Sequence, residues 1–134
     1  MENGIVRRVI GPVVDVQFPS GKMPDIYNAI EVQLDGRKVV MEAVQHIGEN
    51  SVRCISLFST DGMSRGCAAV DTGSPVKMPV GEATLGRMFN VIGEPIDEKG
   101  PVNAEEYMPI HRGAPAFTDL SLIHISEPTR LRRI

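Results

Sequence analysis

The sequence predicts an all-β fold, a small closed antiparallel β-barrel of about six strands. Three observations predict it. Short segments of alternating apolar and polar side chains recur through the first 80 residues. Turn signals separate these segments, and no helical stretch lies between them. Strands this short leave exposed edges in an open sheet, and closing the sheet into a barrel removes those edges.

The individual strands follow from their alternation. Residues 14–18 and 30–34 each carry apolar side chains at every second position. Asp35-Gly36 then forms a tight turn of the kind that joins hairpin strands. Further extended segments are expected at residues 37–47, 51–58 and 76–80, with a turn at residues 48–50 and with Pro79 marking an edge or a strand end. The side chains expected inside the barrel are Val14, Val16, Phe18, Ile30, Val32, Leu34, Val76 and Met78.

The pattern changes after residue 80. Leu85, Met88 and Phe89 are spaced i, i+3 and i+4, which predicts one face of a short helical turn. We therefore expect a domain boundary near residues 80–81. The barrel would comprise residues 1–80, and a second domain would begin in residues 81–119.

Charge and composition argue against several classes of protein. The net charge of -3 and the pI near 5.6 argue against a sequence-independent nucleic-acid binder, which is normally basic. No apolar stretch approaches the ~20 residues that span a bilayer, and the start of the chain lacks the pattern of a signal peptide. Cys54 and Cys67 have no metal-ligand spacing, so we expect reduced, buried thiols. These features predict a soluble protein.

Few side chains suggest chemistry. His46, His111 and His124 are scattered without metal-ligand spacing. We expect His111 to make structural hydrogen bonds, with a role at an interface as the alternative. Asp97 and Glu98 are adjacent acids in a Gly- and Pro-containing turn, and we expect them to be solvated there rather than to act as a general acid or base.

Several motifs resemble those of one family. The run at residues 80–97, VGEATLGRMFNVIGEPID, closely resembles the segment that leads into the nucleotide-binding domain of ATP synthase β subunits, the catalytic subunits of the rotary F-type enzymes. Residues 11–18, GPVVDVQF, resemble the opening strand pair of that family, whereas the related α subunits carry a different pattern there. Asp61-Gly62-Met63 with Arg65-Gly66, and Ile110-His111-Arg112 with Ala114-Pro115, match in the same order.

The resemblance implies a crown β-barrel followed by the truncated start of an α/β P-loop nucleotide-binding domain. The complete family member makes ATP from ADP and phosphate, using a transmembrane proton or sodium gradient and Mg-ATP or Mg-ADP. Its implied partners are the α subunits, through crown barrels packed in a ring, and the central-stalk subunit. Its implied location is the soluble head of a membrane-attached complex, on the cytoplasmic face in bacteria or in the matrix or stroma of organelles.

We expect no catalytic, cofactor-binding or metal residues in this chain. The phosphate loop of the family has the pattern G-x-x-x-x-G-K-[ST]. The one Gly-Lys pair, Gly21-Lys22, is followed by Met23 and has Val16 in place of the first Gly, so we interpret it as a turn. The family's catalytic carboxylate and adenine-lining residues lie beyond this loop.

The position of Arg87 in the motif suggests one structural role. Its guanidinium is expected to form a bidentate pair with a carboxylate and to brace the barrel against the next domain. Residues 81–119 are expected to pack poorly without the sheet that they should cover.

Two alternatives stay open. The polypeptide as given is a non-catalytic assembly barrel only, or it is the N-terminal domain of a related rotary or secretion ATPase. The sequences of residues 11–18 and 85–97 favour the synthase β subunit.

Residues 120–134 depart from the family pattern. Their sequence resembles an in-frame translation of a transposase-type sequencing adapter, so we interpret this tail as non-native. The alternative is a natural basic tail that binds a membrane or nucleic acid through Arg130, Arg132 and Arg133.

Overall fold

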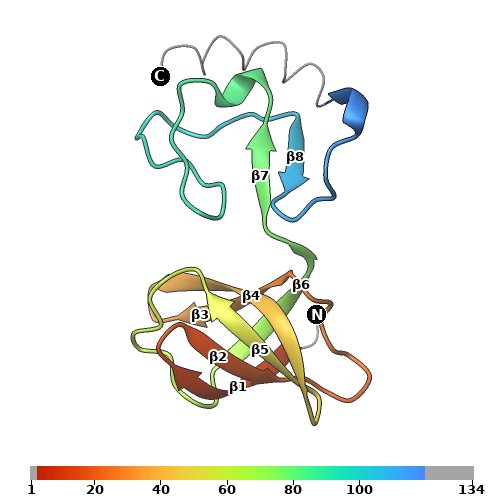
Figure 1. Cartoon of the computed structure of the whole chain (residues 1–134). Coiled ribbons are helices and arrows are strands. Elements are labelled where there is room, and N and C mark those ends of the chain that lie inside the picture. Colours follow the sequence, from red (N-terminus) through yellow and green to blue (C-terminus); the bar gives the residue numbers. More distant parts are fainter. Residues whose placement is uncertain (1–2, 120–134) are drawn as a thin grey trace, which may run out of the picture.

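The computed structural model describes residues 3–119, so the predictions for residues 120–134 lie outside the described residues. The elements are β1 (Asn3–Ile10), β2 (Val13–Gln17), β3 (Asn28–Leu34), β4 (Arg37–Gly48), β5 (Ser51–Ser56), β6 (Ala68–Pro75), β7 (Lys77–Val80), the 3-10 helix η1 (Glu82–Thr84) and β8 (Glu106–Pro109). Figure 1 shows the barrel of β1 to β6 at one end of the molecule and the β7–β8 pair beyond it.

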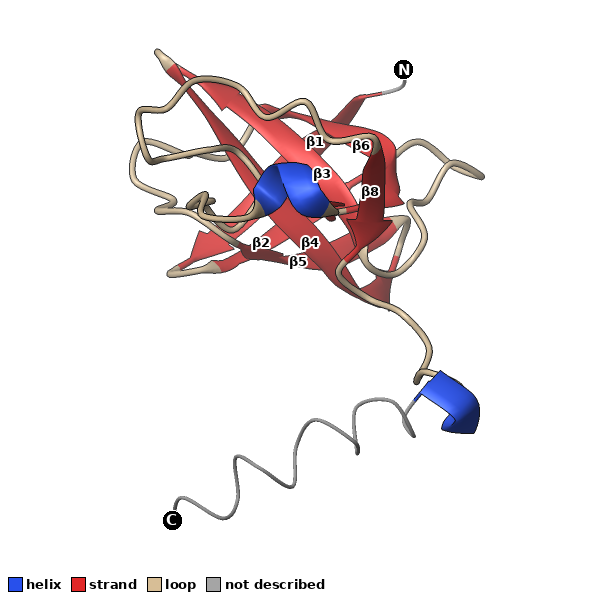
Figure 2. Ribbon diagram, turned by 90° about the horizontal axis from the view of Figure 1, so that it is seen from above, coloured by secondary structure: helices blue, strands red, loops and turns tan. Residues whose placement is uncertain are grey.

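The first six strands form one closed antiparallel barrel, in the order β1-β2-β5-β4-β3-β6. Strand β6 closes it, because it pairs with β1 (Asn3 opposite Val70) and with β3 (Val32 opposite Ala69). The predicted fold class is therefore confirmed. In the view from above, η1 and β8 lie over the barrel (Figure 2).

Both predicted turns are confirmed. Leu34 pairs with Arg37, which leaves the two-residue turn Asp35-Gly36 between β3 and β4. Glu49 and Asn50 connect β4 to β5, and both have positive φ, 51° and 57°. Two consecutive residues with positive φ match the right-handed twist of the flanking strands and favour a tight hairpin.

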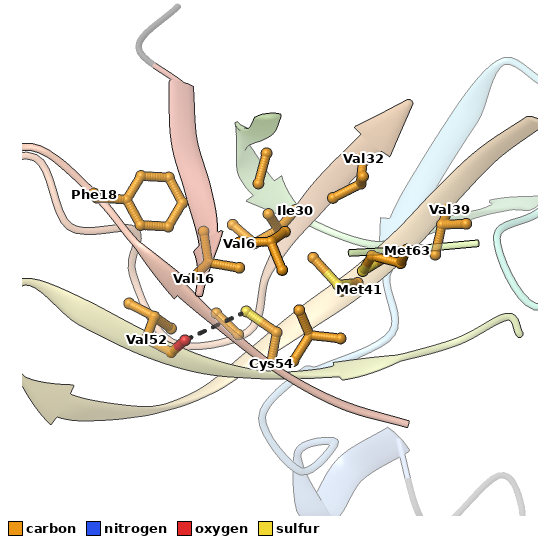
Figure 3. Close-up of a cluster of buried hydrophobic side chains, with 13 residues drawn as sticks. Val6, Val16, Phe18, Ile30, Val32, Val39, Met41, Val52, Cys54 and Met63 are labelled. Carbon is orange, nitrogen blue, oxygen red and sulfur yellow. Dashed lines mark hydrogen bonds between the residues drawn. The ribbon is translucent and has the colours of Figure 1, made fainter. Parts of the chain in front are cut away.

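The barrel interior is filled mainly by aliphatic side chains (Figure 3). The predicted core residues Val14, Val16, Phe18, Ile30 and Val32 are all buried. The rest of the buried cluster consists of Val6, Val39, Met41, Ala43, Val52, Cys54, Met63 and Ala69, and Leu34 packs against it half-buried.

Cys54 behaves as the sequence predicts. It is fully buried, and its Sγ lies 4.0 Å from the carbonyl oxygen of Val52. Burial raises the pKa of the Cys54 thiol to about 12, so the side chain stays a neutral thiol at physiological pH. Cys67 is also free but only half-buried, so the predicted burial is wrong for this residue.

The end of the barrel differs from the prediction. Met78 was expected inside the barrel, but it lies on β7 and pairs with Met108 of β8 in a separate two-stranded sheet. Val76 is buried, though in a second cluster with Ala29 and Val40 rather than in the barrel interior. The domain boundary near residues 80–81 stays a prediction.

Strands β1 and β6 were not predicted from alternation, and each has a physical reason. In β1 the first inward position is Gly4, where a Cβ atom would lie 2.8 Å from Val16 Cγ1, so an apolar side chain does not fit. A bulge between Val6 and Arg8 then shifts the register and interrupts the period of two. Strand β6, AAVDTGSP, is held by its neighbours despite a polar, Gly- and Pro-containing sequence.

The predicted helical turn at Leu85, Met88 and Phe89 is wrong. Only η1 is helical there, and Leu85 and Met88 are 76% and 62% exposed, so no apolar face is buried. Gly86 has φ 68°, a left-handed value that ends a right-handed helix.

The barrel interior sets the stability of the fold. Replacing fully buried Ile30 with alanine is expected to lower the free energy of unfolding by about 2–5 kcal/mol, because it removes buried apolar surface and leaves a cavity. Urea denaturation followed by circular dichroism measures this. Ile10→Ala is the matched control, since Ile10 is 58% exposed and its loss should cost less than about 0.5 kcal/mol. Equal effects of the two substitutions would contradict the assignment of the core.

Candidate functional site

The segment that follows the barrel is organised by one ion pair. In this junction segment, residues 81–100, Arg87 Nε donates to Asp97 Oδ2 at 2.7 Å, and a terminal nitrogen of Arg87 donates to Oδ1 at 3.0 Å. The predicted bidentate pair is therefore confirmed. Its partner lies within the junction segment rather than on the barrel, so the pair braces the segment internally.

Asp97 is not the solvated side chain that was predicted. Its side chain is only 5% exposed, and it accepts hydrogen bonds from the backbone N–H groups of Met88 and Lys99, each at 3.2 Å. The Arg87 guanidinium and these two N–H groups hold the pKa of the Asp97 carboxyl well below its usual range. Glu98, its neighbour, is exposed.

Asn90 forms a second centre in the junction segment. Its side-chain oxygen accepts hydrogen bonds from the backbone N–H groups of Ile92 (3.1 Å) and Glu94 (2.9 Å). These bonds close a tight turn over residues 89–95, in which Phe89 and Pro95 form a β-bridge. Side-chain capture of backbone N–H groups competes with helix formation, which explains the non-helical path here.

The junction segment packs on the barrel end through this turn. Ile92 packs against the cluster of Ala29, Val40 and Val76. Gly93, at φ 83°, comes so close to β7 that a Cβ atom would lie 3.0 Å from the Lys77 carbonyl oxygen. A larger residue at position 93 would push the turn away from the strand.

His111 joins the C-terminal part of the described chain to the barrel. Its ring stacks on Tyr27, with centroids 4.0 Å apart, and its Nε2 lies 3.0 Å from Glu42 Oε2 on β4. The predicted structural hydrogen bond is confirmed, and the contact also forms an internal interface. Tyr27 has φ 73°, a conformation rare for an aromatic residue, and its N–H donates to the Ala43 carbonyl at 2.7 Å.

The other singled-out residues have structural surroundings. His46 Nε2 lies 2.8 Å from the Pro24 carbonyl oxygen. Gly21-Lys22 is the predicted turn, in which Gly21 has φ 80° and the Lys22 N–H donates to the Pro19 carbonyl. His124 lies outside the described residues. Within residues 3–119, His46 and His111 have different partners, the Pro24 carbonyl and the Glu42 carboxylate.

One charged cluster was missed by the sequence analysis. Asp15, buried on the outer side of β2, is the cross-strand partner of Arg8 on β1 and of Arg53 on β5. Arg53 donates to both carboxylate oxygens (2.9 and 3.1 Å), and Arg8 donates to Oδ2 at 3.0 Å. Arg53 holds the pKa of Asp15 below its usual value despite burial. The sequence does show an acid at an outward-facing position of a predicted strand. It does not show that Arg53 lies opposite this acid, because that depends on the register between β2 and β5.

Metal-ligand clusters, membrane-spanning helices and grooves were searched for among the residues that the structure describes. In residues 3–119, no three His, Cys, Asp or Glu side chains gather in a way that could hold a metal ion. Over the same residues, no helix is long and apolar enough to cross a membrane. A groove between barrel and junction segment is lined by Glu31, Lys38, Lys77 and Glu94 beside Ile92, with opposite charges mixed along it. The expectations of no catalytic, cofactor or metal residue stay predictions.

The Asp97 cluster, which consists of the Asp97 carboxylate, the Arg87 guanidinium and the N–H groups of Met88 and Lys99, should lose its hydrogen bonds only at low pH. Since the folded-state pKa of Asp97 is depressed, its contribution to stability is complete above the unfolded-state value of about 3.9 and is lost as pH falls through the folded-state pKa. The NMR amide shifts of Met88 and Lys99 should therefore stay constant from neutral pH down to about pH 4 and change only below it. In Asp97→Asn they should differ from wild type at neutral pH and show no such step. A midpoint at the ordinary Asp value would contradict the cluster.

The His111 contact should hold the C-terminal part of the described chain on the barrel. His111→Ala removes the stacked ring and the Glu42 partner, and it is expected to lower local opening free energy around residues 108–112 by about 1 kcal/mol. Amide hydrogen exchange measures this, with β2 and β5 as unaffected references. His111→Phe keeps the stack and should lose less. If both variants exchange like wild type, the contact does not stabilise this part of the chain.

Comparison with protein-family models identifies the barrel. Residues 6–73 match the model described as "ATP synthase alpha/beta family, beta-barrel domain". The match begins in β1 and ends in β6, so it coincides with the closed barrel of the structure. It covers 68 of the 134 residues, just over half of the chain. The chain belongs to the ATP synthase alpha/beta family, through the β-barrel domain of that family.

Proposed function

We propose that the chain is the N-terminal part of a β subunit of an F-type ATP synthase. In this proposal the complete subunit makes ATP from ADP and phosphate, driven by a proton or sodium gradient. The part described here serves assembly, because its barrel packs beside the barrels of α subunits in a ring. Mg-ATP or Mg-ADP would be held by residues that follow this chain in the family.

The observation that carries the proposal is a complete family barrel that leads directly into a folded junction segment. The barrel is closed by its own six strands and needs no further strand. The junction segment carries the run at residues 80–97 that resembles the β subunits, and the Arg87–Asp97 pair fixes its path. The sequence of residues 11–18, which form the turn after β1, strand β2 and Phe18, favours β over α.

The surface of residues 81–119 supports a domain that follows. Leu85, Met88 and Phe117 are 76%, 62% and 86% exposed, and Ile96 and Tyr107 are more than half exposed. In the proposal, the sheet of a following nucleotide-binding domain covers these apolar side chains. This fits the expectation that the segment packs poorly without the sheet of a nucleotide-binding domain.

The proposal places the protein in a larger complex. Its partners would be α subunits around the barrel and a central-stalk subunit in the complete enzyme. Its location would be the soluble head of a membrane-attached complex, reached through those partners rather than by its own insertion into a bilayer.

Co-assembly tests the proposal directly. The chain, co-expressed with a tagged α-subunit barrel, is expected to co-purify with it, while a tagged β-barrel of an unrelated family should not retain it. Native mass spectrometry of the eluate gives the stoichiometry. Failure to bind α-subunit barrels, with the chain folded by circular dichroism, would contradict the assignment to the synthase.

Nucleotide binding provides an independent measurement. Isothermal titration of the chain with Mg-ATP is expected to show no binding at a dissociation constant of about 1 mM or tighter, since the proposed phosphate site lies in residues that follow this chain. The complete β subunit serves as the positive control. Saturable binding of Mg-ATP to this chain would overturn the proposal that the nucleotide site lies in the residues that follow it.

A further inference from the structure

Four arginines gather on one side of the barrel. The arginine face consists of Arg7, Arg8, Arg53 and Arg65, around the buried Asp15. The bulge between Val6 and Arg8 explains why two consecutive residues of β1 both lie outside the barrel. It thereby adds a cation that a regular strand would place in the core.

Asp15 orients two of these side chains without neutralising the face. Its carboxylate takes the Nε and one terminal nitrogen of Arg53, and the Nε and one terminal nitrogen of Arg8. Each guanidinium has five N–H donors, so each keeps donors for another acceptor. Arg8 is 57% exposed and Arg53 34%, which leaves those donors within reach of a ligand.

Arg7 and Arg65 extend the face. Gln17 Oε1 accepts a hydrogen bond from Arg7 Nε at 2.7 Å, so Arg7 is held over β2 beside Asp15. Arg65 is exposed, and it lines the same open hollow as Arg7 and Arg8. The four arginines face two acids, Asp15 and Glu49, so the surface carries a local excess of positive charge on a chain whose net charge is -3.

The hollow is not purely ionic. Ile47, 39% exposed, lines it together with Ser51 and the arginines. An exposed aliphatic side chain among guanidinium groups suits a ligand that has both carboxylates and an apolar side chain. A free phosphate would leave Ile47 unused, and the net negative charge of the chain disfavours long polyanions such as nucleic acid.

We propose that the arginine face docks a short acidic peptide segment of a partner protein. Carboxylates of the segment form bidentate pairs with Arg7, Arg8 and Arg65, and a neighbouring apolar side chain packs on Ile47. Arg7, Arg8 and Arg53 of this surface lie on β1 and β5, Arg65 lies between β5 and β6, and Ile47 lies near the end of β4. The proposal goes beyond the ring assembly proposed above.

A fluorescein-labelled peptide of alternating Glu and Leu tests this by anisotropy with the full chain. Binding is expected at ~50 mM salt and should weaken strongly at ~500 mM. Arg7→Glu with Arg65→Glu should weaken it about tenfold or more, and these substitutions leave the Arg8–Asp15–Arg53 cluster in place. Lys38→Glu with Lys77→Glu is the matched control, with the same change in net charge on the β3–β4–β6 side, and should change affinity less than about twofold.

Further measurements distinguish binding of an acidic peptide from binding of other anions. Ile47→Ser should weaken the Glu-Leu peptide but not a Glu-Ser peptide, which would support the apolar contact. Four results would overturn the proposal: no peptide binding, an equal loss in the two double variants, full displacement by an equal concentration of pyrophosphate, or binding to phosphatidylserine vesicles alone. Circular dichroism of each variant keeps misfolding distinct from loss of the site.

Discussion

Strand β6 pairs with both β1 and β3, and this double pairing is the constraint on which the other features depend. It closes the sheet, so each of the six strands has two hydrogen-bonded neighbours and the Val-rich interior is shielded from water. The β3–β6 edge carries extra support, since the Asn28 side chain donates to Asp71 and the Thr72 hydroxyl donates to the Ala29 carbonyl. Because β6 ends at Pro75 and β7 begins at Lys77, closure also fixes where β7 starts, and the junction segment follows β7 at residue 81.

The sequence predicted those strands whose alternation of apolar and polar residues matches the side chains that the barrel buries. In β2 and β3, alternate side chains fill the barrel, so the period of two is visible without a structure. Strand β1 was not predicted because Phe18 and Val16 fill the space beside Gly4. An apolar side chain does not fit there, so the alternation is incomplete. Strand β6 was not predicted because its hydrogen-bonded neighbours β1 and β3, rather than its own side chains, hold it in an extended conformation.

The same distinction applies to the candidate site. A bidentate role for Arg87 was predictable from the motif, but its partner was not, because Asp97 reaches it only through the tight turn centred on Asn90. The spacing of Leu85 and Met88 suggested a helix, yet helical periodicity stabilises a helix only where an apolar surface receives it. Here the side chains of Asn90 and Asp97 capture backbone N–H groups instead, and Leu85 and Met88 stay exposed.

The strand order places the contacts with the following chain and the arginine face on largely different strands. Strands β4, β3 and β6 are consecutive around the barrel, and this half or its flanks carry the contacts with the following chain: Ile92 on the Ala29 cluster, and His111 on Tyr27 and Glu42. Strands β1, β2 and β5 are also consecutive and carry Arg7, Arg8 and Arg53 of the arginine face, while Arg65 lies between β5 and β6 and Ile47 lies near the end of β4. A partner on the arginine face would contact β4 at Ile47, whereas the following chain contacts β4 at Val40 and Glu42. A displacement of the chain that follows the barrel would act through β3 and β4, and it would reach the arginine face along β4 to Ile47, through the β4–β5 pairing, or through β6 and its pairing with β1. The two surfaces therefore use different side chains but share β4, so this strand is the structural link between them.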